Sequence, residues 1–217
     1  MDLTTAPTIP STNPATPSTN PATLSAAPLK VAVILASNRE GRFAPVVADW
    51  FRTHTDPHQG IGTDLIDVAE LDLPIALSYR PDADAQARLA AVAARLAAAD
   101  AFVVITPEYN HSYPAPLKNL IDWHRAEWQA KPVAFVSYGG VSGGLRAVEH
   151  LRQVFAELHT VGIRETVSFH NAGALFDDEG RHRDPAGCDA AAKALLDQLI
   201  WWGHALRDAK AVRPYDA

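Results

Sequence analysis

The chain of 217 residues has one cysteine, Cys188, one methionine, and no surplus of basic side chains. A single cysteine excludes an intrachain disulfide and a dithiol redox centre within one chain, and it fits a reducing cytoplasm. There are 19 Lys and Arg against 25 Asp and Glu, so the net charge is -6. This balance argues against nucleic acid or an anionic membrane as a partner. We therefore expect a cytoplasmic protein whose few important arginines act locally.

Long apolar runs are also missing, and none approaches the roughly 20 residues that a membrane-spanning helix needs. Residues 1–28 lack the basic start and the continuous apolar segment of a secretory signal. They contain six prolines and an imperfect repeat of STNPAT, with few large apolar side chains to offset the entropy of ordering. We predict a disordered Pro/Thr/Ala-rich tail over residues 1–28 and a single folded domain over residues 29–217.

From Leu29 onward, short apolar runs alternate with segments of helical periodicity. The apolar runs are LKVAVILAS, TDLIDVAEL with a strand expected over Asp64 to Val68, DAFVVITP, KPVAFVSYGG and the stretch from Ile163 to Phe169. The helical segments are Ala44 to His54, Ala85 to Ala99, Leu117 to Trp128, Leu145 to Leu158 and Ala190 to Ala205. Apolar, β-branched runs of this length are typical of strands buried on both faces. The alternation predicts an α/β fold in three layers, with a five-stranded parallel sheet between helices in a flavodoxin-like arrangement.

The loop after the first predicted strand has features of an anion site. In an open α/β sheet, ligands bind beyond the carboxyl ends of the strands. This loop, SNREGRF, places Ser37, Arg39, Gly41 and Arg42 before a helix. Free N–H groups and the helix dipole favour an anion there, and arginine side chains suit phosphate. The alternative is that Ser37 only caps the helix and both arginines are solvated.

The loops after the third and fourth predicted strands are also unusual. TPEYNHSYPAPLKN begins at a strand end, and its prolines restrict the backbone, so it can present N–H groups to a flat heterocycle with little loss of entropy. The alternative is a turn whose proline starts a helix. SYGGVSGGLR has four glycines that permit a close approach of the backbone to a ligand. Three such loops at one sheet edge favour a binding site.

These motifs resemble the NAD(P)H-dependent FMN reductase family of flavodoxin-like flavoproteins, from about Lys30 to the C-terminus. The resemblance implies that the first loop holds the FMN phosphate, that the second lies along the isoalloxazine ring and ribityl chain, and that the third borders the flavin. The matching residues are Ser37, Arg39, Gly41 and Arg42 in the first loop, Pro107, Glu108, Tyr109 and Asn110 in the second, and Tyr138, Gly139 and Gly140 in the third.

The resemblance further implies an FMN-dependent oxidoreductase with NAD(P)H as co-substrate. Electrons would pass through FMN to a small acceptor of the quinone, flavin, azo, nitro or chromate type, by ping-pong kinetics. Because the flavin carries the chemistry, no catalytic acid or base is required. The alternative is a flavodoxin-like electron carrier that serves a protein partner. Such carriers usually have a Thr-rich phosphate loop and a strongly acidic face, which this sequence lacks. A third possibility is a binding module of this fold that has lost its flavin.

Two further features bear on metals and partners. The spacing of His170, His182 and Cys188 matches no compact metal motif, so we expect no metal. The resemblance implies a homodimer or a dimer of dimers. His111, Tyr113 and the helix containing Trp123 are candidates for its interface, and the large tryptophans serve as core or interface anchors. The tryptophans concerned are Trp123, Trp128, Trp201 and Trp202.

Overall fold

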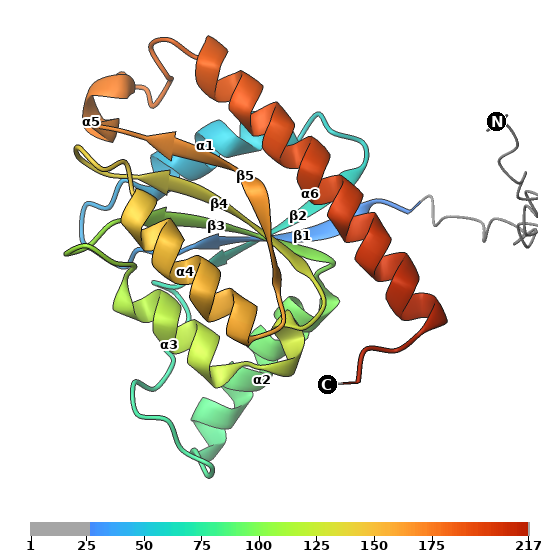
Figure 1. Ribbon diagram of the computed structural model, residues 1–217. Coiled ribbons are helices and arrows are strands. Elements are labelled where there is room, and N and C mark those ends of the chain that lie inside the picture. The colour runs from blue at the N-terminus through green and yellow to red at the C-terminus, as the bar shows by residue number, and fades with distance from the viewer. Residues whose placement is uncertain (1–26, 217) are drawn as a thin grey trace, which may run out of the picture.

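The computed structural model describes residues 27–216, which form one parallel sheet of five strands with helices on both faces (Figure 1). The strands are β1 (Leu29–Leu35), β2 (Ile61–Asp67), β3 (Ala101–Pro107), β4 (Pro132–Tyr138) and β5 (Val161–Phe169). The helices are α1 (Ala44–Thr55), α2 (Ala83–Ala98), α3 (Ala115–Trp123), the short 3-10 helix η1 (Ala126–Trp128), α4 (Leu145–Glu157), α5 (Ala172–Leu175) and α6 (Ala186–Val212). The predicted tail lies outside the described residues, apart from Ala27 and Pro28.

The strand order is β2-β1-β3-β4-β5, and every neighbouring pair is parallel. The chain moves from β1 outward to β2 and then returns to the other side of β1 with β3. The order therefore reverses between β1 and β3, which is where open α/β sheets bind ligands. The predicted α/β fold with a five-stranded parallel sheet between helices is confirmed.

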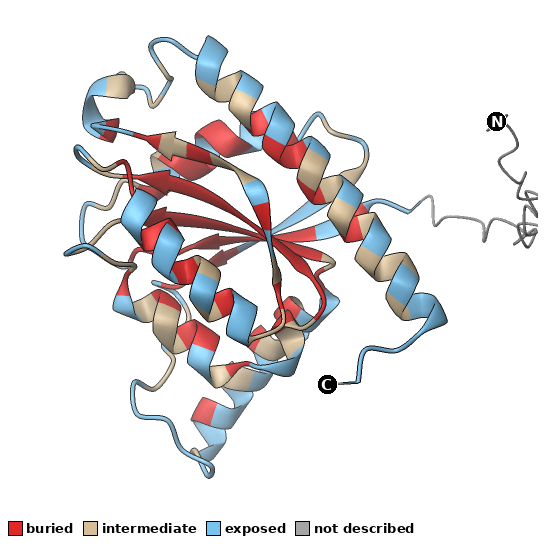
Figure 2. Cartoon of the chain, viewed as in Figure 1, coloured by how far each residue is buried: buried red, intermediate tan, exposed pale blue. Residues whose placement is uncertain are grey.

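Two apolar layers hold the helices on the sheet. One layer packs α1 and α6 on one face, and the other packs α2, α3 and α4 on the opposite face. Figure 2 shows β3 and β4 buried along their length between these layers, as all seven residues of each strand are. Trp128 is fully buried between Phe102 and Phe155, so this tryptophan is a core residue.

The structure corrects several predicted boundaries. β2 begins at Ile61 rather than near Asp64, because its first residues are partly exposed and carry little apolar signal. α3 ends at Trp123, since His124 is extended, and a separate turn then places Trp128 in the core. The final helix is longer than predicted at both ends.

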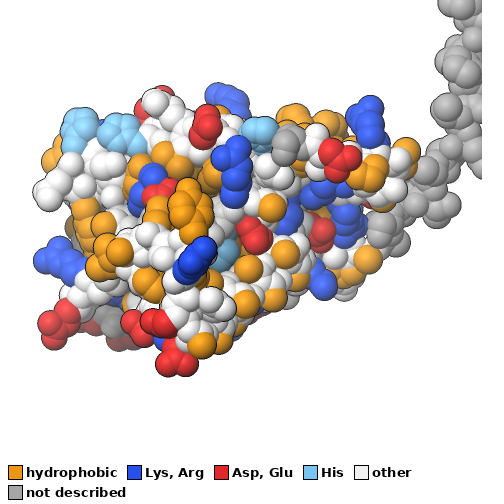
Figure 3. Space-filling view, turned by 90° about the horizontal axis from the view of Figure 1, so that it is seen from below, with side chains coloured by type: hydrophobic (Ala, Val, Ile, Leu, Met, Phe, Trp, Pro, Cys, Tyr) orange, Lys and Arg blue, Asp and Glu red, His pale blue; other side chains and the backbone are white. Residues whose placement is uncertain are grey.

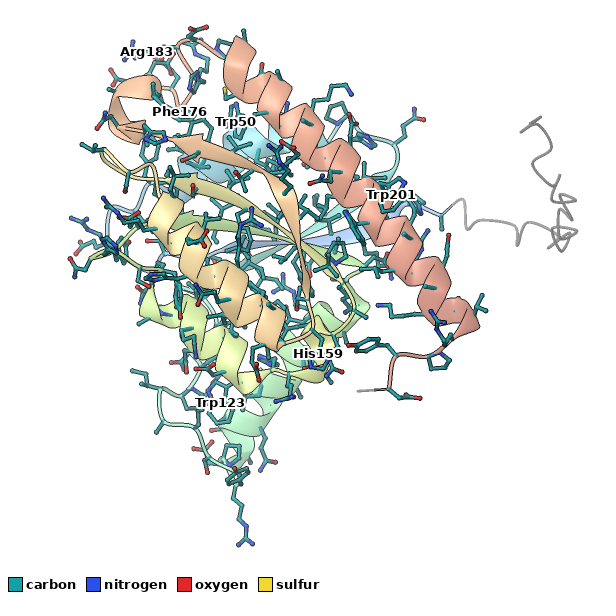
Figure 4. The ribbon with its side chains drawn as sticks, in the orientation of Figure 1. Trp50, Trp123, His159, Phe176, Arg183 and Trp201 are labelled. Carbon is teal, nitrogen blue, oxygen red and sulfur yellow. The ribbon has the colours of Figure 1, made fainter. Side chains whose placement is uncertain are left out.

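The predicted polar loop after β5 contains the short helix α5 and a return of the chain that pairs Phe176 with His182. In Figure 4, Phe176 lies at the end of the sheet close to Trp50, and Phe169 of β5 packs edge-on against both rings. These three aromatic rings cover the end of the sheet on the face that packs against α1. In the described part of the chain, no helix is both long and apolar enough to cross a membrane.

Candidate functional site

The loops after β1, β3 and β4 meet at one edge of the sheet, on the left in Figure 1, as predicted from their order in the chain. The Ser37 hydroxyl forms a hydrogen bond of 2.6 Å with the Tyr109 hydroxyl, which joins the first loop to the second. Pro107 is in register with Tyr138, so the second and third loops leave the sheet side by side. The three groups of predicted residues are therefore brought together.

Ser37 is fully buried at the end of β1 and does not cap the following helix. Its hydroxyl accepts a hydrogen bond of 3.4 Å from the Arg39 N–H. The N-cap of α1 is Phe43, and no side chain among the described residues caps the first N–H groups of the helix. The alternative in which Ser37 serves as the helix cap is wrong. The start of α1 keeps free N–H groups directed at the sheet edge, which suits an anion.

The two predicted phosphate arginines lie in different environments. Arg39 is exposed, and its guanidinium forms no hydrogen bond or ion pair with any residue in the range 27–216. Arg42 is largely buried and forms a two-pronged ion pair with Asp67 at the end of β2. It also donates a hydrogen bond of 2.7 Å to the Ser37 carbonyl. Arg39 is available to a ligand, whereas Arg42 ties the first loop to β2.

Gly41 gives the first loop its shape. It has a φ of +63°, in the left-handed region that favours glycine, and the adjacent Arg42 N–H donates to the Arg39 carbonyl. The turn places Arg39 outside and Arg42 inside. Gly41 thus shapes the first loop, and its predicted place in the FMN phosphate site stays a prediction.

The second loop contains a tight hairpin that the sequence did not suggest. The backbones of Tyr109 and Ser112 exchange hydrogen bonds of 2.8 and 3.1 Å. Asn110 and His111, between them, have φ values of +48° and +73°. Positive φ at both central residues is the pattern of a two-residue hairpin turn, in which Asn is well tolerated. The stiffness of the loop therefore comes from this turn as well as from its prolines.

Glu108 fastens the second loop to α4. Its carboxylate accepts a hydrogen bond of 2.7 Å from the Arg146 side chain and one of 3.1 Å from the Arg146 N–H. Burial of the carboxylate raises its pKa, but the hydrogen bonds from Arg146 and Ser142 and the Arg146 charge outweigh burial, so the pKa of Glu108 is lowered. The carboxylate stays ionised and keeps the Tyr109 turn in place beside the third loop.

We expect Glu108→Gln to destabilise the protein by about 1 kcal/mol at pH 7, since Arg146 is half exposed and screened by water. Because the folded-state pKa is lowered, this stabilisation is complete above the unfolded pKa and is lost as the pH falls through the folded pKa. Thermal unfolding from pH 7 to 3 should show a Tm difference between variant and wild type that disappears at the acid end. A difference that stays constant across this range would contradict the ion pair.

Tyr138 supplies an unpartnered polar atom between the loops. Its side chain is buried, and its hydroxyl has no hydrogen bond with any described residue. Burial and the nearby Tyr109 raise its pKa, and the Ser37 hydroxyl and the Arg42 charge oppose this more weakly. A buried hydroxyl without a partner is costly, so it marks a place where a ligand would supply one.

The glycines of the third loop differ in their use. The Gly139 N–H donates to the Phe169 carbonyl, and Gly140 is exposed with open space where a side chain would stand. Gly144, the N-cap of α4, has a φ of +85°, and a Cβ there would lie 2.7 Å from that of Ser137. Only Gly140 is thus open to a ligand, and Gly144 is needed for packing.

Sequence reasoning missed the partners that hold these loops. Asp67 and Arg146 position Arg42 and Glu108, and Ser112 is bound through its hydroxyl to His150. A charged residue ending an apolar strand was the available signal for Asp67. Nothing local marked Arg146 or His150, because exposed charged residues are common on an amphipathic helix.

The residues considered for a metal have other contacts, and His170 lies against the third loop. His170 bonds the Val141 carbonyl, and His182 packs on Phe176. No cluster of three potential metal ligands occurs within residues 27–216.

The comparisons with known proteins agree with this geometry. The model of the NADPH-dependent FMN reductase family matches residues 29–174. The chain belongs to this family. The matched range includes all three loops of the site and ends within α5.

Two relatives with similar sequences are named as oxidoreductases that use NAD(P)H. An NAD(P)H-dependent FMN reductase of Schizosaccharomyces pombe is 36% identical over 122 residues, which cover 53% of this chain and 60% of that protein. An NAD(P)H:quinone oxidoreductase of Solanum tuberosum is 31% identical over 174 residues, covering 71% of this chain and 87% of the relative. The match to the first relative thus spans less than two thirds of its length.

Among solved structures, FerB, a flavoenzyme NAD(P)H:(acceptor) oxidoreductase from Paracoccus denitrificans, superimposes with a TM-score of 0.64 at 23% identity. The superposition covers 82% of this chain and 98% of the other. It supports the flavodoxin-like fold.

Proposed function

We propose that this protein is an FMN-dependent NAD(P)H oxidoreductase that passes electrons to a small acceptor of the quinone, flavin, azo, nitro or chromate type. The observation that carries this proposal is the pairing of an uncapped helix start with the free Arg39, beside the buried Tyr138 hydroxyl. This arrangement suits a phosphate joined to a flat, polar body. The names of the relatives support the same activity.

The residues present fit FMN in charge and shape. The N–H groups at the start of α1, with Arg39, would hold the phosphate. The Ser37 hydroxyl, which accepts a hydrogen bond from the Arg39 N–H, would hold this loop in place beside the phosphate. Pro107 to Asn110 would lie along the ring and ribityl chain, and Tyr138 to Gly140 would border them. Arg42 acts as a positioning residue in this proposal, because Asp67 occupies its guanidinium.

FMN, when bound, supplies the ability to take electrons from a nicotinamide nucleotide and give them to an acceptor. The chain's own part is to bind and orient. The turn at Asn110 and the Glu108–Arg146 pair give the site one rigid wall. We expect the nucleotide and the acceptor to use the same space beside this wall in turn. This sharing of one space is the reason to expect ping-pong kinetics.

Steady-state rates of the FMN-loaded protein test this proposal. NADH or NADPH oxidation should be measured at several fixed concentrations of a benzoquinone, and double-reciprocal plots should give parallel lines. Intersecting lines would contradict the ping-pong order. A protein that binds FMN but reduces none of a panel of small acceptors would favour the electron-carrier alternative.

A homodimer or dimer of dimers is part of the same proposal. The loop between β2 and α2 exposes Ile75, Leu77 and Tyr79, and the last two line a hollow of about 370 Å³ with Trp123 of α3. Figure 3 shows hydrophobic side chains gathered on the face that includes this loop. Trp201 projects from α6 on another surface (Figure 4). Exposed apolar groups of this kind favour an interface.

Light scattering tests the dimer. It should give a mass of at least twice the chain mass of 23.4 kDa, and a measured mass equal to that of one chain would contradict the dimer.

We also propose a cytoplasmic location, since the single cysteine fits a reducing compartment. Cell fractionation that recovers the protein outside the cytoplasm would contradict this.

A further inference from the structure

His111 occupies a backbone position that costs stability. Its φ of +73° lies in the left-handed region, at the second central position of the hairpin turn. Such turns prefer glycine there, because any side chain is strained at this φ. Strain of this kind persists at functional sites when the side chain is used. The strain at His111 therefore suggests that its side chain has a function.

A second histidine lies next to it. The rings of His111 and His150 have centroids 6.2 Å apart, and His150 shares a hydrogen bond of 2.9 Å with the Ser112 hydroxyl. His150 belongs to α4, two turns after the glycine-rich loop, and both imidazoles are exposed. The pair thus stands at the rim between the second and third loops.

We propose that His111 is a proton donor to a quinone-type acceptor during its reduction, with His150 as a positioning residue. This inference rests on the proposed function, and it departs from the expectation that no catalytic acid is needed. Imidazole is the side chain best suited to give and regain a proton near neutral pH. The hairpin turn fixes the backbone of His111, and the contact with His150 limits where its ring can lie.

The proton balance of the reaction leaves room for such a donor. Reduction of a quinone to a hydroquinone adds two electrons and two protons. NAD(P)H supplies both electrons together with one proton. For the second proton, an N–H bond of the imidazolium form of His111 breaks as an O–H bond forms on the acceptor oxygen, which leaves neutral imidazole. The ring then regains a proton from water, to which it is exposed.

The test compares two acceptors in His111→Gly and His111→Asn, since both replacements tolerate positive φ. A benzoquinone needs the proton, whereas ferricyanide takes one electron and no proton. We expect kcat with benzoquinone to fall by about 100-fold or more and the rate with ferricyanide to stay within about twofold. The Tm of His111→Gly without flavin should rise by roughly 2–4 °C, as the strain is removed.

Ala130→Gly is the matched control. Ala130 has a φ of +50° and precedes β4, at the opposite edge of the sheet from the site. Its replacement relieves the same kind of strain and should leave both acceptor rates unchanged. Equal losses with both acceptors in the His111 variants, or no loss with either, would overturn the proton-donor role. A wild-type protein that reduces neither acceptor would instead overturn the proposed function, and this inference with it.

Discussion

Gly144→Ala is expected to lower the free energy of unfolding by about 3 kcal/mol, the largest stability effect that we predict for one methyl group at this edge. The backbone φ of +85° is unfavourable for alanine and costs about 1 kcal/mol. The added Cβ would also lie 2.7 Å from the Ser137 Cβ and 3.0 Å from the Tyr138 N atom. Overpacking of this kind adds about 1–3 kcal/mol. Since strand backbone cannot yield as a flexible side chain can, the end of β4 must move.

Urea unfolding of Gly144→Ala and of Gly187→Ala provides the comparison. Gly187 lies in the first turn of α6, with open space around its Cβ position, so alanine there should be neutral or slightly stabilising. Gly144→Ala should also weaken FMN binding, because Tyr138 borders the site. Equal stability of the two variants would show that the third loop does not require the left-handed conformation at Gly144.

Arg39→Ala is expected to weaken FMN binding about 10- to 100-fold. The lost charge-assisted hydrogen bond to phosphate is worth about 1.5–3 kcal/mol. Because Arg39 has no partner among the described residues, its removal leaves no buried group unsatisfied, and Tm without FMN should not change. Quenching of FMN fluorescence on titration measures the affinity. Arg39→Lys, which keeps the charge but loses the forked donors, should fall between wild type and alanine.

Arg125→Ala is the control for Arg39→Ala. Arg125 is also exposed, and it follows α3, near the start of β4 and away from the three loops. Its loss should leave FMN affinity unchanged. If Arg39→Ala binds FMN as tightly as Arg125→Ala, the phosphate lies elsewhere. By contrast, Arg42→Ala should lower Tm even without FMN, because it leaves the buried Asp67 without its ion-pair partner.

Much of the fold could be predicted because its signals are local. Apolar β-branched runs such as those of β3 and β4 are buried throughout, and the buried side chains of α2 and α4 recur at helical spacing on the face toward the sheet. The β2 boundary was wrong because an edge strand is half exposed and mixes polar with apolar residues. The end of α3 was wrong because Trp128 carries an apolar signal that belongs to a separate turn.

The position of the site could be predicted from the sequence, but the ion pairs and the turn that hold its loops could not. Parallel strands bring their carboxyl ends to one edge, so the three loops could be placed from their order alone. Which arginine is free depends on Asp67, which is 25 residues away from Arg42 and becomes its neighbour only in the folded sheet. The turn at Asn110 and His111 was missed because histidine is not the residue expected at a positive φ.

The most direct measurement of the central claim is an anaerobic titration of the FMN-loaded protein followed by its visible spectrum. We predict that NADH or NADPH bleaches the flavin absorbance and that a benzoquinone, added after the nucleotide is consumed, restores it. The same cycle should require more FMN for loading in Arg39→Ala than in Arg125→Ala. A protein that takes up no FMN, or whose bound flavin is bleached by neither nucleotide, would contradict the account.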